Sequence, residues 1–449
     1  NRILQTMLLV AQVLPDPVHA PPDAAIELKP ETAVRASLAG LDSRQPFDVA
    51  LVADTGSDGT MHVAGFTGER VEFRSLENVE QPIKRMRRRL SRIASSPEDF
   101  RDLDAEATQN LLRFLARQGS LLYDGIVRTQ VGESGLLNDE DRRIQLVSAR
   151  ESFLPLEFMY DHPSPLPEAR LCPRAREALQ TGQCTHCDQL DEEAKRAYVC
   201  PLGFWCMSRV IERHAVRPVA ETNLSGTEYA LQSDPIAGRD TLDVLNAAVY
   251  AASNRVQEAQ IEELLETLAD VTDHRVERVP DWGTWRDAVQ SRNPSILVLV
   301  PHTLEDVDSI PALEIGEEQQ LPEDQITAGY VHAARDYRPP VVLLLGCETA
   351  EPDVPFQAFA VQFRIHGAAI VLSTLTPVLG RHAVPVAQML VGELKRAARA
   401  SGTFGDALLG LRRRALAAGI PMVLSLVAYG DADWRLGSET AARVPVDEP

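Results

Sequence analysis

The C-terminal half of the chain alternates between short, almost continuously apolar runs and longer amphipathic segments. The apolar runs lie at 243–251, 295–301, 341–346, 368–374 and 422–429. Apolar residues recur at helical spacing in the segments between and after them, at 257–270, 282–290, 356–366, 382–399 and 403–418. Strands that are apolar on both faces are typical of a parallel sheet covered by helices on both sides. The pattern therefore predicts an α/β fold, a sandwich of helices around a mostly parallel sheet.

The N-terminal half has a mixed pattern instead. Between 48 and 74, apolar and polar residues alternate in short runs around a Gly-rich turn at 56–59, which predicts a small antiparallel meander. Apolar residues at helical spacing then predict helices around 83–93 and from 106 to 126, followed by a short strand at 144–147. We therefore expect an α+β region before the α/β domain.

Pattern and composition together divide the chain into five segments. We expect a Pro- and Ala-rich linker or arm at 1–40, an N-terminal α+β region at 41–161 and a Cys-rich insert at 162–238. An α/β domain at 239–437 and a tail at 438–449 follow. Late in the insert, Val210 and Ile211 follow Cys206 in a stretch that indicates a helix.

Composition and charge narrow the classes of partner. The chain has 449 residues, 44% apolar and 24% charged, which is typical of a globular protein with more than one domain. Its 45 basic and 65 acidic residues give a net charge of −20, which disfavours a nucleic-acid partner. A solvated helix face is accordingly favoured over a nucleic-acid surface for the six basic residues between 84 and 92. No apolar run reaches the roughly 20 residues of a membrane span, and no secretory pattern is visible, so we expect no membrane contact and a cytoplasmic location.

Five of the six cysteines lie in one short window. Cys172 precedes Cys184 by 12 positions, Cys184 forms a Cys-x-x-Cys pair with Cys187, and Cys200 follows 13 positions later. Four thiolates so spaced predict a closed, tetrahedral structural zinc site. Cys206 is interpreted as a core thiol. Reduced cysteines packed in an ordinary hydrophobic insert remain the alternative.

Two apolar runs end in reactive side chains. The run 295–301 is followed by His302, and the run 341–346 by Cys347. Because carboxyl ends of parallel strands meet at one edge of a sheet, an imidazole and a thiol there are the parts needed for nucleophilic acyl transfer. A free cysteine is only about 3% thiolate at pH 7, and a neighbouring imidazole raises that fraction. Each residue alone is more typical of a buried thiol or an exposed histidine.

The sequence segments around these residues resemble those of a known family. PSILVLVPH, VVLLLGCETA, GAAIVLSTLTPV and TFGDALLGLRRRAL resemble CHAT peptidases of the caspase, separase and gingipain clan. LPLEFMYD at 154–161 and CPLGFWCMSRVIERH at 200–214 also resemble segments of such proteins. The resemblance covers about 45–437 and is most specific at 341–376. It implies a caspase-like catalytic domain at 239–437 and a pseudo-caspase-like region at 41–161.

The resemblance also implies a catalytic site. His302 would be the general base and Cys347 the nucleophile, and Gly346 would leave room for a substrate backbone. The backbone N–H groups of Cys347 and Thr303 would form the oxyanion hole. Thr303 stands where many relatives have glycine, and Leu379-Gly380 replaces an aspartate of the family pattern.

By the same resemblance, Ser373, Thr374, Glu348 and Asp353 would flank the substrate groove. An acid there would favour a basic P1 side chain; the alternative is that Glu348 and Asp353 face solvent. Eight acids and no basic residue lie within 305–324. That loop is interpreted as a solvated acidic loop, with gating of the groove or recognition of a basic partner as the alternatives.

The function implied is a cysteine endopeptidase that cuts a protein partner. By resemblance, it would act in a bacterial antiviral or cell-death defence system, under a sensor or regulatory partner, on a substrate such as a gasdermin-like effector. The alternative is a catalytically idle CHAT-fold scaffold that binds a partner protein. A nucleotide-sensing domain is disfavoured because neither a phosphate-binding P-loop nor a Gly-x-Gly-x-x-Gly motif after a strand occurs.

Overall fold

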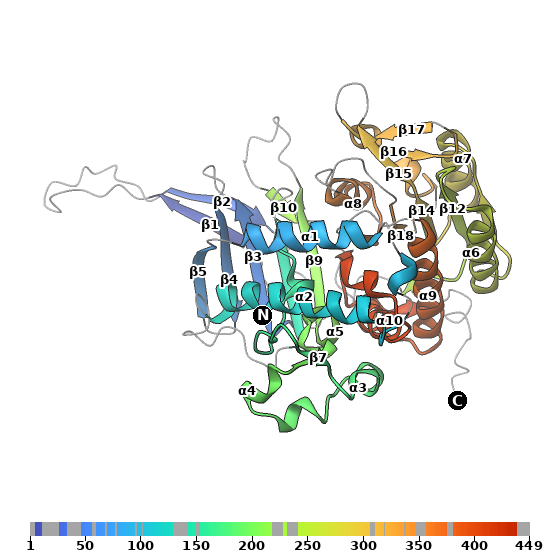
Figure 1. Cartoon of the computed structure of the whole chain (residues 1–449). Helices are drawn as coiled ribbons and strands as arrows, with labels where there is room; N and C mark the ends of the chain where they lie inside the picture. Colours follow the sequence, from blue (N-terminus) through green and yellow to red (C-terminus); the bar gives the residue numbers. More distant parts are fainter. Residues whose placement is uncertain are drawn as a thin grey trace, which may run out of the picture.

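The computed structural model places most of the chain in one folded body (Figure 1). It describes residues 5–10, 27–33, 46–55, 60–67, 70–76, 79–94, 97–100, 102–128, 142–148, 153–217, 228–230, 241–305, 310–317, 319–335, 338–346, 356–374 and 380–437. All elements below lie in these ranges.

One large sheet runs through the molecule, in the order β13-β12-β14-β18-β19-β20-β9-β6-β3-β4-β5. Its C-terminal part consists of β12 (Ala248–Ala252), β13 (Val276–Arg278), β14 (Ile296–Val300), β18 (Val341–Leu344), β19 (Ile370–Thr374) and β20 (Leu426–Gly430). The first five of these strands are parallel and β20 is antiparallel to β19. Numbered along the chain, the six strands therefore lie in the order 2-1-3-4-5-6. Each of the five apolar runs predicted as strands contains a strand of this part, although 422–425 of the last run belongs to a short 3-10 helix.

The N-terminal part of the sheet continues from β20. It consists of β9 (Val210–Arg217), β6 (Arg143–Ser148), β3 (Val49–Thr55), β4 (Met61–Thr67) and β5 (Arg70–Leu76). Strands β9, β6 and β3 are parallel, whereas β3, β4 and β5 form the antiparallel meander that the alternating pattern predicted. The two parts of the sheet meet where β20 pairs with β9.

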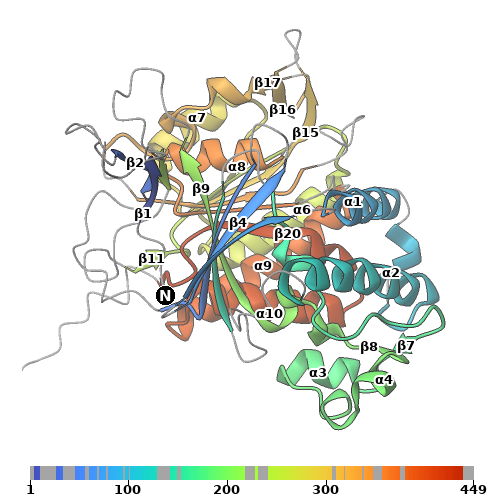
Figure 2. The same cartoon turned by 90° about the vertical axis from the view of Figure 1, so that its left-hand side faces the viewer.

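Helices cover both faces of the sheet (Figure 2). One face carries α1 (Glu80–Ala94), α2 (Glu106–Tyr123), α6 (Glu258–Val271), α9 (Gly380–Arg399) and α10 (Phe404–Ala417), and the other carries α7 (Trp282–Arg292) and α8 (Phe356–Ile365). Successive residues of β14 enter the two cores in turn: Ile296 and Val298 face one, Leu297 and Leu299 the other. The predicted α/β/α sandwich with a mostly parallel sheet is confirmed. Its inner strands β14 and β18 are apolar at every position because neither of their faces meets water.

The basic segment at 84–92 lies in α1 as predicted. Ile83, Met86 and Leu90 of this helix are buried, while Lys84, Arg85 and Arg88 are exposed. This is the amphipathic arrangement that the helical spacing indicated.

Smaller elements complete the described chain. The Cys-rich segment contains β7 (Arg170–Leu171), α3 (Ala175–Thr181), α4 (Glu192–Lys195), β8 (Tyr198–Val199) and α5 (Trp205–Ser208). Strand β11 (Leu242–Asp243) pairs with β21 (Leu436–Gly437). The segment expected as a linker or arm contains β1 (Gln5–Val10) and β2 (Glu27–Ala33), and β2 joins the sheet through β10 (Glu228–Ala230).

Two predictions of local structure are wrong. Val210 and Ile211 are not helical: the helix α5 ends at Ser208, and β9 begins at Val210. This part of the expected insert is a strand because it pairs with β6 on one side and β20 on the other.

The acidic segment at 305–324 is also not a plain solvated loop. It contributes to the antiparallel sheet of β15 (His302–Glu305), β16 (Pro311–Ile315) and β17 (Gln319–Pro322). Ala312, Leu313 and Ile315 are buried against the core, which fixes the middle strand in place. Glu314 and Glu323 are buried too, so these two acids are not solvated.

Candidate functional site

The carboxyl ends of β14 and β18 lie side by side. In their parallel register Leu299 is paired with Leu344, and the Leu345 N–H donates to the Leu299 carbonyl at 3.0 Å. Pro301 and His302 follow β14, and Leu345 and Gly346 follow β18. His302 is only 7% exposed. The sheet therefore places the predicted base and the residue before the predicted nucleophile at the same edge.

Three of the predicted site residues, Cys347, Glu348 and Asp353, lie outside the described residues. The dyad and the acidic side of the groove therefore stay predictions.

His302 is held as the first residue of a strand. In the β15–β16 pair, His302 lies opposite Glu314, which is 8% exposed. Directly opposed residues of an antiparallel pair have Cβ atoms about 4.5–5.5 Å apart. A carboxylate so placed can accept a hydrogen bond from the imidazole and fix the orientation of the ring. In the sequence, Glu314 is visible only as one acid of the segment 305–324, because the strand that pairs it with His302 has no alternating pattern.

Three buried hydroxyls accompany His302 at this edge. Thr303, Ser373 and Thr374 are almost fully buried, and their Oγ atoms have no hydrogen-bond partner within the described part of the chain. Ser373 and Thr374 end β19, which lies next to β18, with Ser373 paired to Leu344. An unsatisfied buried hydroxyl costs about 1–3 kcal/mol, so these groups are available to bind a polar ligand.

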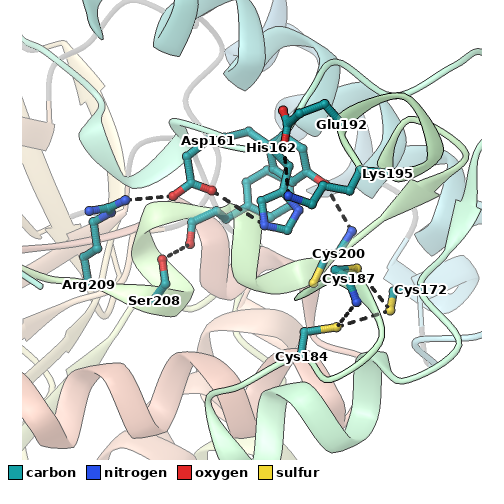
Figure 3. A network of polar contacts seen from close by, with 12 residues as sticks. Asp161, His162, Cys172, Cys184, Cys187, Glu192, Lys195, Cys200, Ser208 and Arg209 are labelled. Carbon is teal, nitrogen blue, oxygen red and sulfur yellow. Dashed lines mark hydrogen bonds and ion pairs between the residues drawn. The ribbon is translucent and has the colours of Figure 1, made fainter. Parts of the chain in front are cut away.

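The four predicted zinc ligands converge. The Sγ atoms of Cys172, Cys184, Cys187 and Cys200 all lie within 4.8 Å of one another, and all four side chains are buried. Cys172 Sγ is 3.5 Å from Cys184 Sγ and 3.6 Å from Cys187 Sγ (Figure 3). Zn–S bonds of about 2.3 Å in a tetrahedron hold sulfurs roughly 3.8 Å apart. The spacing fits a tetrahedral metal ion and is far too long for a disulfide.

Backbone contacts preorganise this cluster. The Cys187 N–H donates to Cys184 Sγ at 3.4 Å, and β7 brings Cys172 beside β8, where its N–H donates to the Val199 carbonyl at 2.9 Å. The Cys200 N–H donates to the Tyr160 hydroxyl at 3.0 Å, and burial raises the pKa of Tyr160 well above its usual value, so that the hydroxyl stays neutral.

The thiols of the cluster influence one another. The contact with Cys187, and then that with Cys200, lowers the pKa of the Cys172 thiol far below its ordinary value. The contact with Cys172 raises the pKa of both Cys187 and Cys200. The contact with Cys200 lowers the pKa of Cys184 to about 7. Thiolates at Cys172 and Cys184 are thus favoured, and a cation is needed before all four sulfurs lose their protons.

Cys206 and His186 lie outside this group. Cys206 is fully buried on α5, and burial raises the pKa of its thiol to about 12, as expected of a core thiol. The His186 ring contacts Tyr198 edge-on, with ring centres 4.9 Å apart.

The LPLEFMYD segment connects the Cys-rich segment to the sheet. Glu157 accepts a hydrogen bond from Arg213 of β9 at 2.6 Å, and Asp161 accepts one from Arg209 at 2.8 Å. Figure 3 shows Asp161 between Arg209 and His162. With Tyr160 held at Cys200, the segment contacts β9 and the cysteine cluster at once. Nothing in its sequence alone signals this bracing role.

Comparison with known proteins gives no family assignment. No family model matches the chain, and no curated protein matches it. Among the described residues, no helix is both long and apolar enough to cross a bilayer.

The chain is similar to solved structures of two peptidases at low identity. The separase–securin complex of Saccharomyces cerevisiae matches with a TM-score of 0.42 at 10% identity, over 85% of this chain and 30% of the separase-complex chain. The RgpB pro- and mature-domain complex of Porphyromonas gingivalis matches with a TM-score of 0.35 at 11% identity, over 80% of this chain and 78% of that one. The Arg-specific cysteine proteinase gingipain R matches with a TM-score of 0.34 at 11% identity, over 80% of this chain and 76% of that one. This chain thus spans under a third of the first of these, and likeness at this level assigns neither family nor activity.

Proposed function

We propose that this chain is a cysteine endopeptidase of the caspase, separase and gingipain clan, of the CHAT type, with Cys347 as nucleophile and His302 as general base. One observation carries the proposal: β14 and β18 are adjacent parallel strands, and His302 and Gly346 each lie two residues beyond the end of one of them. Gly346 is bonded to Cys347. Consecutive Cα atoms lie about 3.8 Å apart and neighbouring strands about 4.8 Å apart. On this connectivity we base the proposal that the Cys347 thiol lies near the His302 imidazole.

The chemistry follows from these two groups. His302 takes the proton of the Cys347 thiol, and the thiolate attacks the carbonyl carbon of the scissile peptide. The backbone N–H groups of Cys347 and Thr303 would stabilise the oxyanion, at about 2.7–4 kcal/mol for each donor. His302 then gives its proton to the leaving amine, and water hydrolyses the thioester. Glu314, opposite His302, acts as a positioning residue for the ring.

Substrate recognition is proposed at the same edge. The buried hydroxyls of Ser373 and Thr374 can hydrogen-bond a peptide backbone, and Gly346 leaves that backbone room to approach. Glu348 and Asp353 would select a basic P1 side chain through a charge-assisted contact.

The biological setting is proposed from the sequence resemblance alone. The chain would act in the cytoplasm in a bacterial defence or cell-death system, where a sensor or regulatory partner releases the activity and a gasdermin-like or other effector is cut. The idle CHAT-fold scaffold is the outcome if the thiol proves unused.

We further propose that Cys172, Cys184, Cys187 and Cys200 hold a structural Zn²⁺. The support is the fit of the measured sulfur separations to a four-thiolate tetrahedron. A closed four-thiolate site leaves no position for substrate, so the ion would stabilise the Cys-rich segment and take no part in peptide cleavage.

Mapping of new protein termini tests the peptidase. The wild-type chain and the Cys347→Ala variant are each co-expressed with the products of neighbouring genes, and the N-termini that appear are identified by mass spectrometry. The proposal predicts termini that occur only with wild type, after basic residues. The same termini with Cys347→Ala would overturn it.

A further inference from the structure

A second cluster of metal-ligating side chains lies at the seam of the central sheet. Glu212 and His214 are alternate residues of β9, so they share one face of this strand, and Asp431 directly follows β20. One ligand atom from each of the three lies within 4.8 Å of the others. The cluster thus spans the junction between the N-terminal and C-terminal parts of the sheet.

The three side chains are fully buried, each at most 1% exposed. Glu212 Oε1 lies 2.7 Å from His214 Nε2, and Glu212 Oε2 accepts a hydrogen bond from the Ala432 N–H at 2.8 Å. The backbone beside Asp431 thereby fixes the Glu212 carboxylate. Buried carboxylates together with an imidazole are a donor set that metal ions use in proteins.

Gln145 provides an independent observation. This residue is paired with Glu212 in the β6–β9 register and is 0% exposed. Its Nε2 donates to Glu212 Oε1 at 3.2 Å, whereas its Oε1 has no hydrogen-bond partner within the described part of the chain. A buried amide oxygen without a partner is costly. Turning the amide over would exchange the Nε2 contact with Glu212 for an oxygen that faces the cluster, and a bound cation would stabilise that oxygen as a fourth ligand.

We propose that Glu212, His214, Asp431 and Gln145 bind one divalent transition-metal ion. Donors about 2.0–2.2 Å from such an ion lie roughly 3.3–3.6 Å apart in a tetrahedral site, and the observed span, from 2.7 Å to at most 4.8 Å, brackets this separation. One nitrogen and three oxygens suit Zn²⁺ or Mn²⁺, in contrast to the four sulfurs of the cysteine cluster.

The ion would link the N-terminal and C-terminal parts of the sheet. The β20–β9 pairing involves only Arg213 of β9, opposite Tyr429 and Gly430. A metal held by β9 on one side and by Asp431 on the other would reinforce this short junction. Because the ligands are buried, the site is structural, and it is independent of the proposed dyad.

Mn²⁺ titration of the full chain tests the site, because Mn²⁺ favours oxygen donors over thiolates. The full chain, dialysed against a mild chelator that leaves the four-thiolate zinc in place, is titrated with Mn²⁺ at physiological salt, and free Mn²⁺ is read by electron paramagnetic resonance. We expect one bound Mn²⁺ per wild-type chain and at least tenfold weaker binding by Asp431→Asn. Asp433→Asn is the matched control, since Asp433 is equally buried but outside the cluster; it should bind as wild type does.

Gln145→Glu keeps the test decisive if Asp431→Asn does not fold. A third carboxylate should tighten Mn²⁺ binding at least tenfold, and this variant should melt several degrees lower in chelator and recover when Mn²⁺ is added. Equal Mn²⁺ affinity of wild type, Asp433→Asn and Gln145→Glu would overturn the proposal. A melting temperature of the protein that changes with pH but not with Mn²⁺ would also overturn the proposal, because a proton-linked contact without metal behaves in this way.

Discussion

Single buried charges hold the junction of this molecule, and Arg213 is the clearest case. Its guanidinium donates to Glu157 and to the Leu154 carbonyl, at 2.6 and 3.0 Å, and lies over the Phe153 ring. Both charged side chains are at most 1% exposed. A buried pair of this kind adds little net stability over a hydrophobic replacement, yet removing one partner leaves an uncompensated charge.

Glu157→Leu should therefore lower the free energy of unfolding by about 3–5 kcal/mol. The Glu157→Leu/Arg213→Met double variant should recover most of that loss, because no buried charge remains. Urea unfolding of wild type, both single variants and the double variant measures the coupling. A double variant as unstable as the sum of the singles would contradict the assignment.

Cys206 yields a prediction about alkaline pH. Burial raises the pKa of its thiol from 9.0 to about 12, so the folded chain keeps the proton where the unfolded chain releases it. The corresponding stability is complete below about pH 9 and is lost as pH rises toward 12, at up to about 1.4 kcal/mol per pH unit. Unfolding free energies between pH 8 and 10.5 should fall more steeply for wild type than for Cys206→Ala. Parallel slopes would show that the thiol is not protected.

At the scale of elements, the three-stranded sheet β15–β17 fixes the position of His302, the predicted base. Its first residue is His302, and the turn that follows β16 contains Gly316 at φ +59°. A Cβ on Gly316 would lie 1.9 Å from the Pro280 carbonyl oxygen. The turn is thus pressed against the segment before α7, which in turn fixes β16 opposite β15.

Gly316→Ala should lower stability by about 1–3 kcal/mol and reduce peptidase activity, since both the positive φ and the contact exclude a side chain. Gly392→Ala is the control. It lies inside α9, where nothing is within 4 Å of an added Cβ, and should raise stability by about 0.5–1 kcal/mol. Thermal unfolding and turnover of a peptide substrate report the two effects. A Gly316→Ala protein as stable and active as wild type would contradict the structure of this turn.

The elements that could be predicted from sequence are those whose pattern reports burial directly. The inner strands of the C-terminal part were recognisable because both of their faces are covered, so that nearly every position is apolar. The edge strand β13 was not predicted, since Glu277 and Arg278 interrupt its apolar pattern. Strand β9 was not, because its interior positions include Glu212, Arg213 and His214, and the partners that allow these charges to be buried come from distant segments. The β16 strand was hidden because acids surround its few apolar residues.

The residues of the candidate site likewise divide into those that could be predicted from the sequence and those that could not. The convergence of Cys172, Cys184, Cys187 and Cys200 was predictable because their spacing within 172–200 is itself the signal. The closeness of His302 to Gly346 followed from strand order, which the apolar runs implied. Glu314 could not be paired with His302 from sequence, since that neighbour depends on the register of a strand that the pattern did not reveal.

At the scale of the whole molecule, the Cys-rich segment contacts both the N-terminal and the C-terminal halves of the chain. Arg113 of α2 donates to the Ala169 carbonyl, and Arg413 of α10 donates to the Met207 carbonyl, each at 2.7 Å. Arg176 of α3 donates to the Ala417 carbonyl at the end of α10, at 2.9 Å. The Cys-rich segment thus contacts helices from both the N-terminal and the C-terminal halves, as its position beneath them in Figure 1 also shows.

Loss of the proposed zinc should therefore destabilise more than the Cys-rich segment. Cys184→Ser should lose one equivalent of zinc per chain, become sensitive to proteases between 162 and 200, and melt several degrees lower. Cys206→Ala should keep its zinc, because Cys206 lies outside the cluster. Metal analysis and limited proteolysis of both variants provide the measurement. Equal zinc content in wild type and Cys184→Ser would exclude this ligand set.

The most direct test of the proposed dyad is the rate at which a peptidyl acyloxymethyl ketone with arginine at P1 labels Cys347. Intact-mass and peptide analysis identify the modified thiol, and the second-order rate constant at pH 7 is compared between wild type and His302→Ala. We predict selective labelling of Cys347 in wild type and a rate at least about 10²-fold lower in His302→Ala, because the imidazole generates the reactive thiolate. Equal rates in the two proteins, or no reaction at Cys347 beyond that of a simple thiol, would contradict the account.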